Sequence, residues 1–278
     1  MREVFKNLIP NWAKAAARKS LEIWKNTALY TSTGVEGRCL IVTFHKSGSQ
    51  WFRSILDSEI MHVAADYRFY TYKLLPLKGF DSRPLQMRRL PEGLANGIYG
   101  PLYIAPECLC DGFGDLDRVA VIIRDPRNVI ISWYDSLLYT HAEMGDISAI
   151  RKQLAASNEA VGIDVMIDHA HRFGTFKAMD SWLNMAKADN RVSIFRFEDI
   201  FGVNGEAEYT EMLSHFGLVY DPIRVHKAFE RFSFNNMAKK NKHYKEGKKR
   251  QWNERLNDSH QDRIATLCPI TTEYYAVC

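Results

Sequence analysis

The sequence predicts an α/β fold of three layers, with helices on both faces of a central, mostly parallel sheet. Short apolar runs that are typical of buried strands recur along the chain, and the first two are each followed by a turn and an apolar-faced helix. Strands that alternate with helices in this way form parallel sheets covered on both faces. The composition, with 46% hydrophobic and 25% charged residues in 278, is that of a globular protein.

The first strand-turn-helix unit begins with the apolar run CLIVTF at residues 39–44. The turn HKSGSQ follows, and the helix WFRSILDSEIM then places Trp51, Ile55, Leu56 and Ile60 on one face. This order is the opening of a βα unit.

A second unit consists of RVAVII at 118–123, the turn RDPRN and the helix VIISWYDSLLYTH. A third strand, VSIFRF at 192–197, leads into EDI. Between the first two units, residues 66–103 are broken by four prolines, and we expect loops there with a strand at 97–103. Residues 141–190 read as mostly helical, most clearly at 178–186.

We expect one domain at 37–278, preceded at 1–36 by an amphipathic helical extension. Residues 2–29 carry six Lys or Arg against two Glu, with Trp12 and Trp24 at helical spacing. Such a helix suits peripheral contact with an anionic membrane surface. Packing of the tryptophans against the domain is the alternative that we favour, because the acidic residues and Thr27 weaken the apolar face.

The composition also limits the compartment and the partners. The five cysteines are odd in number and show no framework spacing, which fits a reducing compartment. No apolar run approaches the ~20 residues that span a bilayer, and no signal peptide is evident, so we expect a soluble cytoplasmic protein. The net charge of +4 suits an anionic small molecule and is too weak to indicate nucleic acid.

The turn after the first strand has the features of an anion-binding loop. Backbone N–H groups at a helix N-terminus favour an anion, Gly48 permits close approach, and Lys46 adds positive charge. Ser47 and Ser49 add hydroxyl donors. The loop is not a Walker motif, because the second glycine is missing and Lys46 precedes Gly48. An ordinary βα turn that contains a lysine is the alternative.

Two later segments also suit phosphate. Arg124 follows the second strand, where open α/β sheets bind ligands, and Ser132 lies eight residues further on. The alternative is a structural ion pair between Arg124 and Asp125. The segment KEGKKRQW at 245–252 is a basic loop that contains Gly247, and its alternative is a solvated run of charges.

Together these motifs resemble those of the PAPS-dependent sulfotransferase family. HKSGSQW resembles its 5′-phosphosulfate loop, RDPRNVIISWY its 3′-phosphate motif and KEGKKRQW its late RKGxxGDW loop. FRFEDI and SFNNM (233–237) resemble its YED and SFxxM segments, and all five occur in the family's order between residue 37 and about 256. The resemblance implies a P-loop-like sulfotransferase that uses the donor PAPS (3′-phosphoadenosine 5′-phosphosulfate) and releases PAP without a metal ion.

The resemblance also assigns roles to individual residues. The 5′-phosphosulfate would be held by Lys46, Ser47, Gly48, Ser49 and Gln50. Lys46 would stabilise charge on the leaving group. Trp51 and Phe234 would flank the adenine, and the 3′-phosphate would be bound by Arg124, Ser132, Lys245 and Gly247.

The chain departs from the family pattern at the catalytic base. Cytosolic members carry a histidine in a KTHLP segment, whereas the corresponding residues 99–103 here are Tyr-Gly-Pro-Leu-Tyr. His45, beside Lys46, is the leading candidate for the base, and a histidine that only shapes the turn is the alternative. The weaker candidates are His62, Asp66, Asp81 and Glu107. Glu246 is unfavourable to phosphate, and the family's dimer motif is not evident.

Other hypotheses remain open beside an active sulfotransferase. A small P-loop kinase would need a magnesium-binding pair, and a nucleotide-binding relic would have lost its base. His169 and His171 could contribute to a metal site, yet no third ligand is visible in the sequence, and we expect no metal to bind there. The acceptor is a small molecule, glycan or lipid whose identity the aromatic residues of 62–110 and 140–175 do not reveal.

Overall fold

A computed structural model gives the fold and describes residues 37–71, 83–90, 93–108, 116–140, 147–233, 236–237 and 252–277. The predicted helical extension at 1–36 lies outside these ranges. So do Asp81, Phe234, Lys245 and Gly247.

The centre of the fold is a five-stranded sheet in which every pair of neighbouring strands is parallel. Its strands are β1 (Arg38–Val42), β2 (Phe69–Tyr70), β3 (Gly97–Leu102), β4 (Arg118–Ile123) and β5 (Val192–Arg196). The order across the sheet is β2-β3-β1-β4-β5. Because the strands are parallel, their carboxyl ends meet at one edge, and the turns after β1 and β4 lie side by side there.

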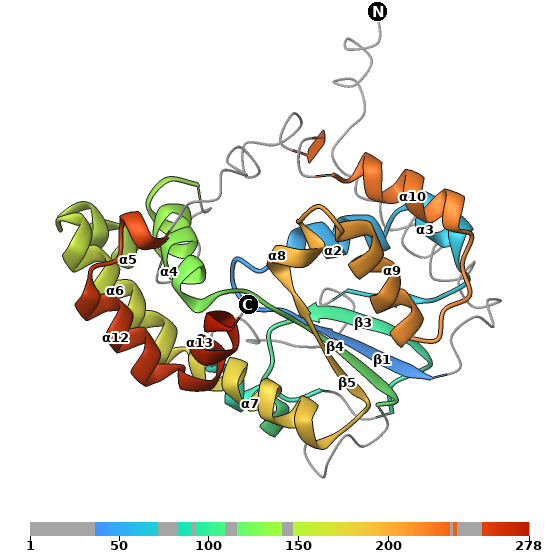
Figure 1. The fold of residues 1–278 in the computed structure, drawn as a ribbon, viewed down its shortest axis with the longest axis horizontal. Helices are drawn as coiled ribbons and strands as arrows, with labels where there is room; N and C mark the ends of the chain where they lie inside the picture. The colour runs from blue at the N-terminus through green and yellow to red at the C-terminus, as the bar shows by residue number, and fades with distance from the viewer. Residues whose placement is uncertain are drawn as a thin grey trace, which may run out of the picture.

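Helices cover both faces of the sheet (Figure 1), which confirms the predicted three-layer α/β/α architecture. One face carries α2 (Ser49–Leu56), α3 (Glu59–Ala64), α9 (Gly205–His215) and α10 (Pro222–Arg231). The other carries α4 (Pro126–Asp135), α6 (Glu159–Arg172), α7 (Thr175–Ala188), α12 (Asp258–Leu267) and α13 (Pro269–Ala276). The remaining helical segments are a π-helix at Ser136–Thr140, α5 (Ile147–Ala155), α8 (Phe197–Ile200), and short 3₁₀ turns at Leu85–Met87, Pro106–Cys108 and Trp252–Glu254.

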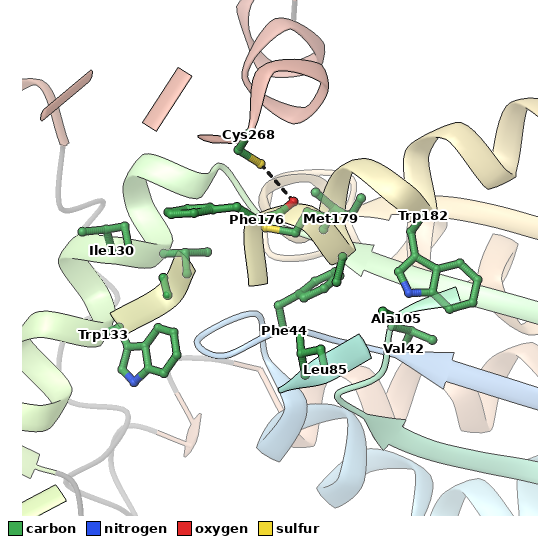
Figure 2. Packing of buried hydrophobic residues seen from close by; sticks show 14 of the residues in the cluster. Val42, Phe44, Leu85, Ala105, Ile130, Trp133, Phe176, Met179, Trp182 and Cys268 are labelled. Atoms are coloured by element: carbon green, nitrogen blue, oxygen red, sulfur yellow. Dashed lines mark hydrogen bonds between the residues drawn. The ribbon is translucent and has the colours of Figure 1, made fainter. Parts of the chain in front are cut away.

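The alternation of side chains along the central strands divides the core into two apolar clusters. Leu40 and Val42 of β1 join the cluster under α4, α6 and α7, whereas Cys39 and Ile41 join the cluster under α2 and α9. Because both faces are buried, the strand reads as a continuous apolar run. Figure 2 shows part of the first cluster, including Trp182 of α7 and the hydrogen bond from the Cys268 Sγ to the Phe176 carbonyl. The indole N–H of Trp182 donates to the Ile104 carbonyl at 2.8 Å.

Two local predictions were wrong, and one further helix has the predicted position but changes its geometry. The single helix expected at 51–61 is broken, because Ser58 is extended and its Oγ accepts the Met61 N–H at 3.3 Å, which caps α3. The helix expected at 129–141 leaves α-helical geometry after Asp135 and continues as the π-helix. The two-residue strand β2 falls where loops were expected.

Within the described part of the chain, no helix is both long enough and apolar enough to cross a membrane.

Candidate functional site

The turn between β1 and α2 is held in a conformation that only certain residues tolerate. Lys46 and Gly48 both have left-handed backbone, with φ of 65° and 83°. A Cβ at Gly48 would lie 3.2 Å from the Phe201 ring and 3.3 Å from the Phe197 ring, so glycine is needed for space as well as for φ. The turn delivers the chain into α2 with the first N–H groups of the helix directed out of its end.

The two serines of this turn have different surroundings. Ser47 is fully buried, and its Oγ has no hydrogen-bond partner among the described residues. Ser49 Oγ lies 2.7 Å from the hydroxyl of Tyr103, which follows β3. Gln50 is exposed and accepts a hydrogen bond from Arg53 at 2.5 Å. A buried hydroxyl without a partner is costly, and it suits a ligand oxygen that would accept its hydrogen.

Arg124 follows β4 and reaches across to the turn after β1. Its Nη1 donates to the Lys46 carbonyl at 2.7 Å, and its guanidinium stacks over the Phe197 ring at 4.5 Å. Its Nε is buried and finds no acceptor within the described ranges. Burial lowers the pKa of Arg124, and the charge of Glu198 is the largest opposing influence. The structure therefore brings the loop lysine and the strand-end arginine together.

The carboxylate next to Arg124 in sequence is engaged elsewhere. Asp125 caps α4 by accepting the Arg127 N–H at 2.9 Å, and it also pairs with the Arg127 guanidinium through contacts of 2.9 and 2.8 Å. Arg127 in turn stacks over Trp252 at 3.9 Å. The ion pair considered for Arg124 and Asp125 is thus formed by Arg127 instead.

Glu198 interacts electrostatically with Arg124, and its two carboxylate oxygens have hydrogen-bond partners. Its Oε1 accepts the Asp125 N–H at 3.3 Å, and its Oε2 lies 2.9 Å from the Tyr275 hydroxyl of α13. The same hydroxyl is 2.9 Å from the Ile123 carbonyl at the end of β4. Burial raises the pKa of Glu198, whereas the Tyr275 hydrogen bond and Arg124 lower it by less.

Trp51, predicted beside the adenine, and Ser132, predicted at the 3′-phosphate, differ in their exposure. Trp51 is only 2% exposed, and its indole N–H donates to the Phe232 carbonyl at 2.6 Å. Its ring meets Phe201 and Phe229 edge to face, with centroids 5.0 and 5.7 Å apart. Ser132 lies half-buried on α4.

Among the candidate bases, His45 lies on the same turn as Lys46. Its imidazole stacks on Trp133 with centroids 4.2 Å apart and packs against Tyr103 at 4.4 Å. Phe173 closes a third side at 5.0 Å.

The weaker candidates are placed differently. His62 packs on Tyr67 in the opposite layer, and Asp66 is exposed. Glu107 accepts a hydrogen bond from the Ser181 hydroxyl at 3.0 Å. His169 packs edge to face on Trp133, and no group of three His, Cys, Asp or Glu suited to a metal occurs among the described residues.

Sequence reasoning placed Tyr103 only among the aromatic residues of the acceptor segments, and it missed Glu198 and Tyr275 as parts of this site. Tyr103 could have been found, because it ends the expected strand at 97–103 beside the first turn. Glu198 lies within the FRFEDI segment but carried no assigned role. Tyr275 has no local signal, because only the packing of α13 brings it to the end of β4.

A cavity of about 520 Å³ lies at the other edge of the sheet, at the amino ends of β1 and β4. Two arginines that line it form ion pairs: Arg38 lies 4.0 Å from Asp117, and Arg191 lies 2.7 Å from Asp189. This cavity is separate from the turns that carry Lys46 and Arg124.

Comparison with known proteins gives a family and a fold. A model of the sulfotransferase domain matches residues 115–268, more than half of the chain, and this range includes the Arg124 segment but not the Lys46 turn. No curated protein sequence matches the chain.

Two solved structures are similar to the chain. Mouse sulfotransferase SULT7A1 complexed with PAP is 14% identical, with a TM-score of 0.59 over 91% of this chain and 93% of that one. Retinol dehydratase in complex with androsterone and the inactive cofactor PAP is 12% identical, with a TM-score of 0.50 over 84% and 80%. At these identities the similarity establishes the fold alone.

Proposed function

The chain belongs to the sulfotransferase domain family, and we propose that it transfers a sulfuryl group from PAPS to a hydroxyl or amine, giving PAP and a sulfated product. The observation that carries this proposal is the hydrogen bond of 2.7 Å from Arg124 to the Lys46 carbonyl. It joins two motifs that each suit an anion and are 78 residues apart in sequence. A donor with phosphate groups at both its 5′ and 3′ positions requires two such anion sites close together.

The turn after β1 would bind the 5′-phosphosulfate. Ser47 Oγ is a buried hydroxyl without a partner in the described chain, and the start of α2 supplies N–H groups and a favourable dipole. Gly48, Ser49 and Gln50 complete this cradle. These features fit a tetrahedral anion.

In the transfer step, the acceptor oxygen or nitrogen forms a bond to sulfur as the bond from sulfur to the bridging oxygen breaks. The electron pair of that bond leaves with PAP, and Lys46 stabilises the negative charge that develops on the bridging oxygen. The protein supplies positioning and charge neutralisation, and no step in this account uses a metal ion.

The 3′-phosphate would be bound by Arg124 together with Ser132. Arg124 Nε is a buried donor that lacks a described acceptor, and its planar guanidinium suits a phosphate. Lys245 and Gly247 are proposed to assist, and Phe234 to flank the adenine with Trp51; the first three lie outside the described residues. Contact of adenine with Trp51 stays a prediction, because that ring is buried here.

We assign His45 as the base that accepts the proton of the acceptor. It lies one residue from Lys46, and its contacts with Trp133, Tyr103 and Phe173 orient the ring. Histidine side chains are suited to proton transfer near neutral pH. The acceptor would approach from this aromatic side, and a small molecule, a glycan and a lipid all remain candidates. A cytoplasmic location also stays a prediction.

The test is conversion of PAPS to PAP in EDTA, measured by chromatography with a panel of phenols, sterols, sugars and amines. We expect PAP and a sulfated product to form with one acceptor class. Lys46→Ala should reduce turnover by ~10²-fold or more, because it removes charge stabilisation of the leaving group. Lys187→Ala, which changes an exposed lysine on α7, serves as the matched control and should retain full activity.

Three outcomes would contradict the proposal. Turnover of ATP with Mg²⁺ in place of PAPS would favour a kinase. Tight PAP binding without turnover on the whole panel would favour a nucleotide-binding relic. Equal activity of Lys46→Ala and the control would show that the wrong loop had been assigned.

A further inference from the structure

Helix α13 is fixed in place by a capping carboxylate from another helix. Asp180 of α7 accepts the Thr271 N–H at 2.8 Å, the Thr271 hydroxyl at 2.7 Å and the Ile270 N–H at 3.3 Å. These N–H and O–H groups at the first turn of α13 have no partner within that helix, so Asp180 of α7 acts as its N-cap. Tyr275 follows Thr271 by four residues and therefore lies on the same face of the helix.

Tyr275 connects α13, which Asp180 caps, to the carboxyl end of β4. Its hydroxyl lies 2.9 Å both from the Ile123 carbonyl and from Glu198 Oε2, and its ring is covered by the Arg196 guanidinium at 4.8 Å. With the Asp125 N–H on the other oxygen at 3.3 Å, each Glu198 oxygen has a hydrogen-bond partner other than Arg124. The side chain of Glu198 is thereby tied to the junction of β4 and α4.

Arg124 is correspondingly left without an ion pair. Its one hydrogen bond is to the Lys46 carbonyl, and no carboxylate of the described ranges lies within ion-pair distance of it. Glu198 is nevertheless the carboxylate whose charge acts most strongly on it. A buried guanidinium beside a mobile carboxylate would form a bidentate pair, and an incoming phosphate would then have to displace that carboxylate.

We propose that Tyr275 is a positioning residue that holds Glu198 away from Arg124, so that the guanidinium stays available for the 3′-phosphate of the donor. This inference rests on the proposed function and adds to it a residue from the last helix. Tyr275 touches neither donor nor acceptor and acts through Glu198. It thus determines how strongly the protein prefers a nucleotide that carries a 3′-phosphate.

The experiment is a calorimetric comparison of PAP and 5′-AMP, which differ only in the 3′-phosphate. Tyr275→Phe removes the hydroxyl and keeps the ring, so Glu198 becomes free to pair with Arg124. We expect the preference for PAP over 5′-AMP to fall by about tenfold, while 5′-AMP affinity changes little. Glu198→Gln removes the competing charge, and this variant should equal or exceed the preference of the wild type.

The double variant Tyr275→Phe/Glu198→Gln distinguishes competition from mere loss of packing. Because the released side chain no longer carries a charge, the preference should return to within about threefold of the wild type. Tyr67→Phe is the matched control, since Tyr67 is also buried and donates its hydroxyl to a backbone carbonyl, that of Leu56, at 2.6 Å. It should lower thermal stability without altering the preference.

Each result has one meaning. A wild type with no preference for PAP would refute the proposed function itself. A wild type that prefers PAP, with an unchanged preference in Tyr275→Phe, would refute the role of Tyr275. A double variant as weak as Tyr275→Phe, or a Glu198→Gln variant weaker than the wild type, would refute the competition between Glu198 and phosphate.

Discussion

Backbone conformation at single residues sets the shape of the turn between β1 and α2. Lys46 adopts left-handed φ although it has a side chain, which is uncommon outside glycine. Residues held in such conformations occur often at functional sites, where surrounding contacts enforce them. Here the Lys46 carbonyl accepts a hydrogen bond from Arg124, so the conformation of this turn and the position of the Arg124 guanidinium depend on each other.

Gly48→Ala tests the turn at this scale. The variant combines a left-handed residue, which costs about 1–2 kcal/mol, with a Cβ only 3.2–3.3 Å from two aromatic rings. Gly217→Ala is the matched control, because Gly217 has a similar φ of 72° and nothing within 4 Å of the added Cβ. Urea unfolding should show loss of stability in both, and calorimetry should show loss of PAP binding in Gly48→Ala alone. Retained PAP affinity in Gly48→Ala would mean that this turn does not bind the donor.

At the scale of elements, helix α13 links α7 to the end of β4. Its first turn is capped by Asp180, and its last turn presents Tyr275 to Glu198 and Ile123. A change at one end of the helix should therefore affect the contacts of Tyr275 at the end of β4, one turn away.

Asp180→Ala should destabilise helix α13 and its packing against α7. It leaves the Thr271 N–H and hydroxyl without their partner, which costs roughly 1–3 kcal/mol in the free energy of unfolding. Because Tyr275 then loses its fixed position, the preference for PAP over 5′-AMP should also fall. Hydrogen exchange of α13 amides, together with calorimetry, measures both effects. Faster exchange with an unchanged preference would separate the helix from the site.

His215, at the end of helix α9, contributes to the pH dependence of stability. Burial lowers the pKa of His215, whose ring nitrogens lie 3.1 Å from Ser193 Oγ and from the Val119 carbonyl. The unfolded chain therefore binds a proton at a higher pH than the folded chain does, so this residue reduces stability as pH falls below about 6.5. His215→Gln should show a smaller loss of stability between pH 7 and pH 5 in urea unfolding.

His226 provides a control of opposite sign. Its hydrogen bond to Glu206, 2.8 Å long, raises its pKa, so its contribution is present at low pH and is lost as pH rises. His226→Gln should therefore lose more stability on acidification than the wild type. A variant of His215 with the same slope as the wild type would contradict the assignment.

For the whole molecule, local patterns were sufficient to predict the layers and the edge at which the site is built. The runs at 118–123 and 192–197 gave β4 and β5 almost to the residue, because strands buried on both faces are uniformly apolar. Strand β2 was not predicted, since two residues carry too little pattern. The break at Asp57–Ser58 depends on capping, which competes closely with continuing the helix.

Only the local parts of the candidate site could be predicted from the sequence, because the long-range contacts carry no local pattern. The turns with Lys46 and Arg124 each have a local signature of strand end, small residue and helix start. The contact between them joins residues 78 apart in sequence, and the hydrogen bond between Tyr275 and Glu198 joins residues 77 apart. Such contacts arise from tertiary packing and leave no mark in either segment alone.

Calorimetric titration of PAP into the wild type and Arg124→Ala, in EDTA and with ATP·Mg²⁺ as comparator, tests the central claim most directly. The account predicts micromolar PAP binding that needs no metal and that weakens in Arg124→Ala by a few kcal/mol, as expected for a lost charge-assisted contact. Absent PAP binding alongside clear binding of ATP·Mg²⁺, or equal PAP affinity in both proteins, would contradict it.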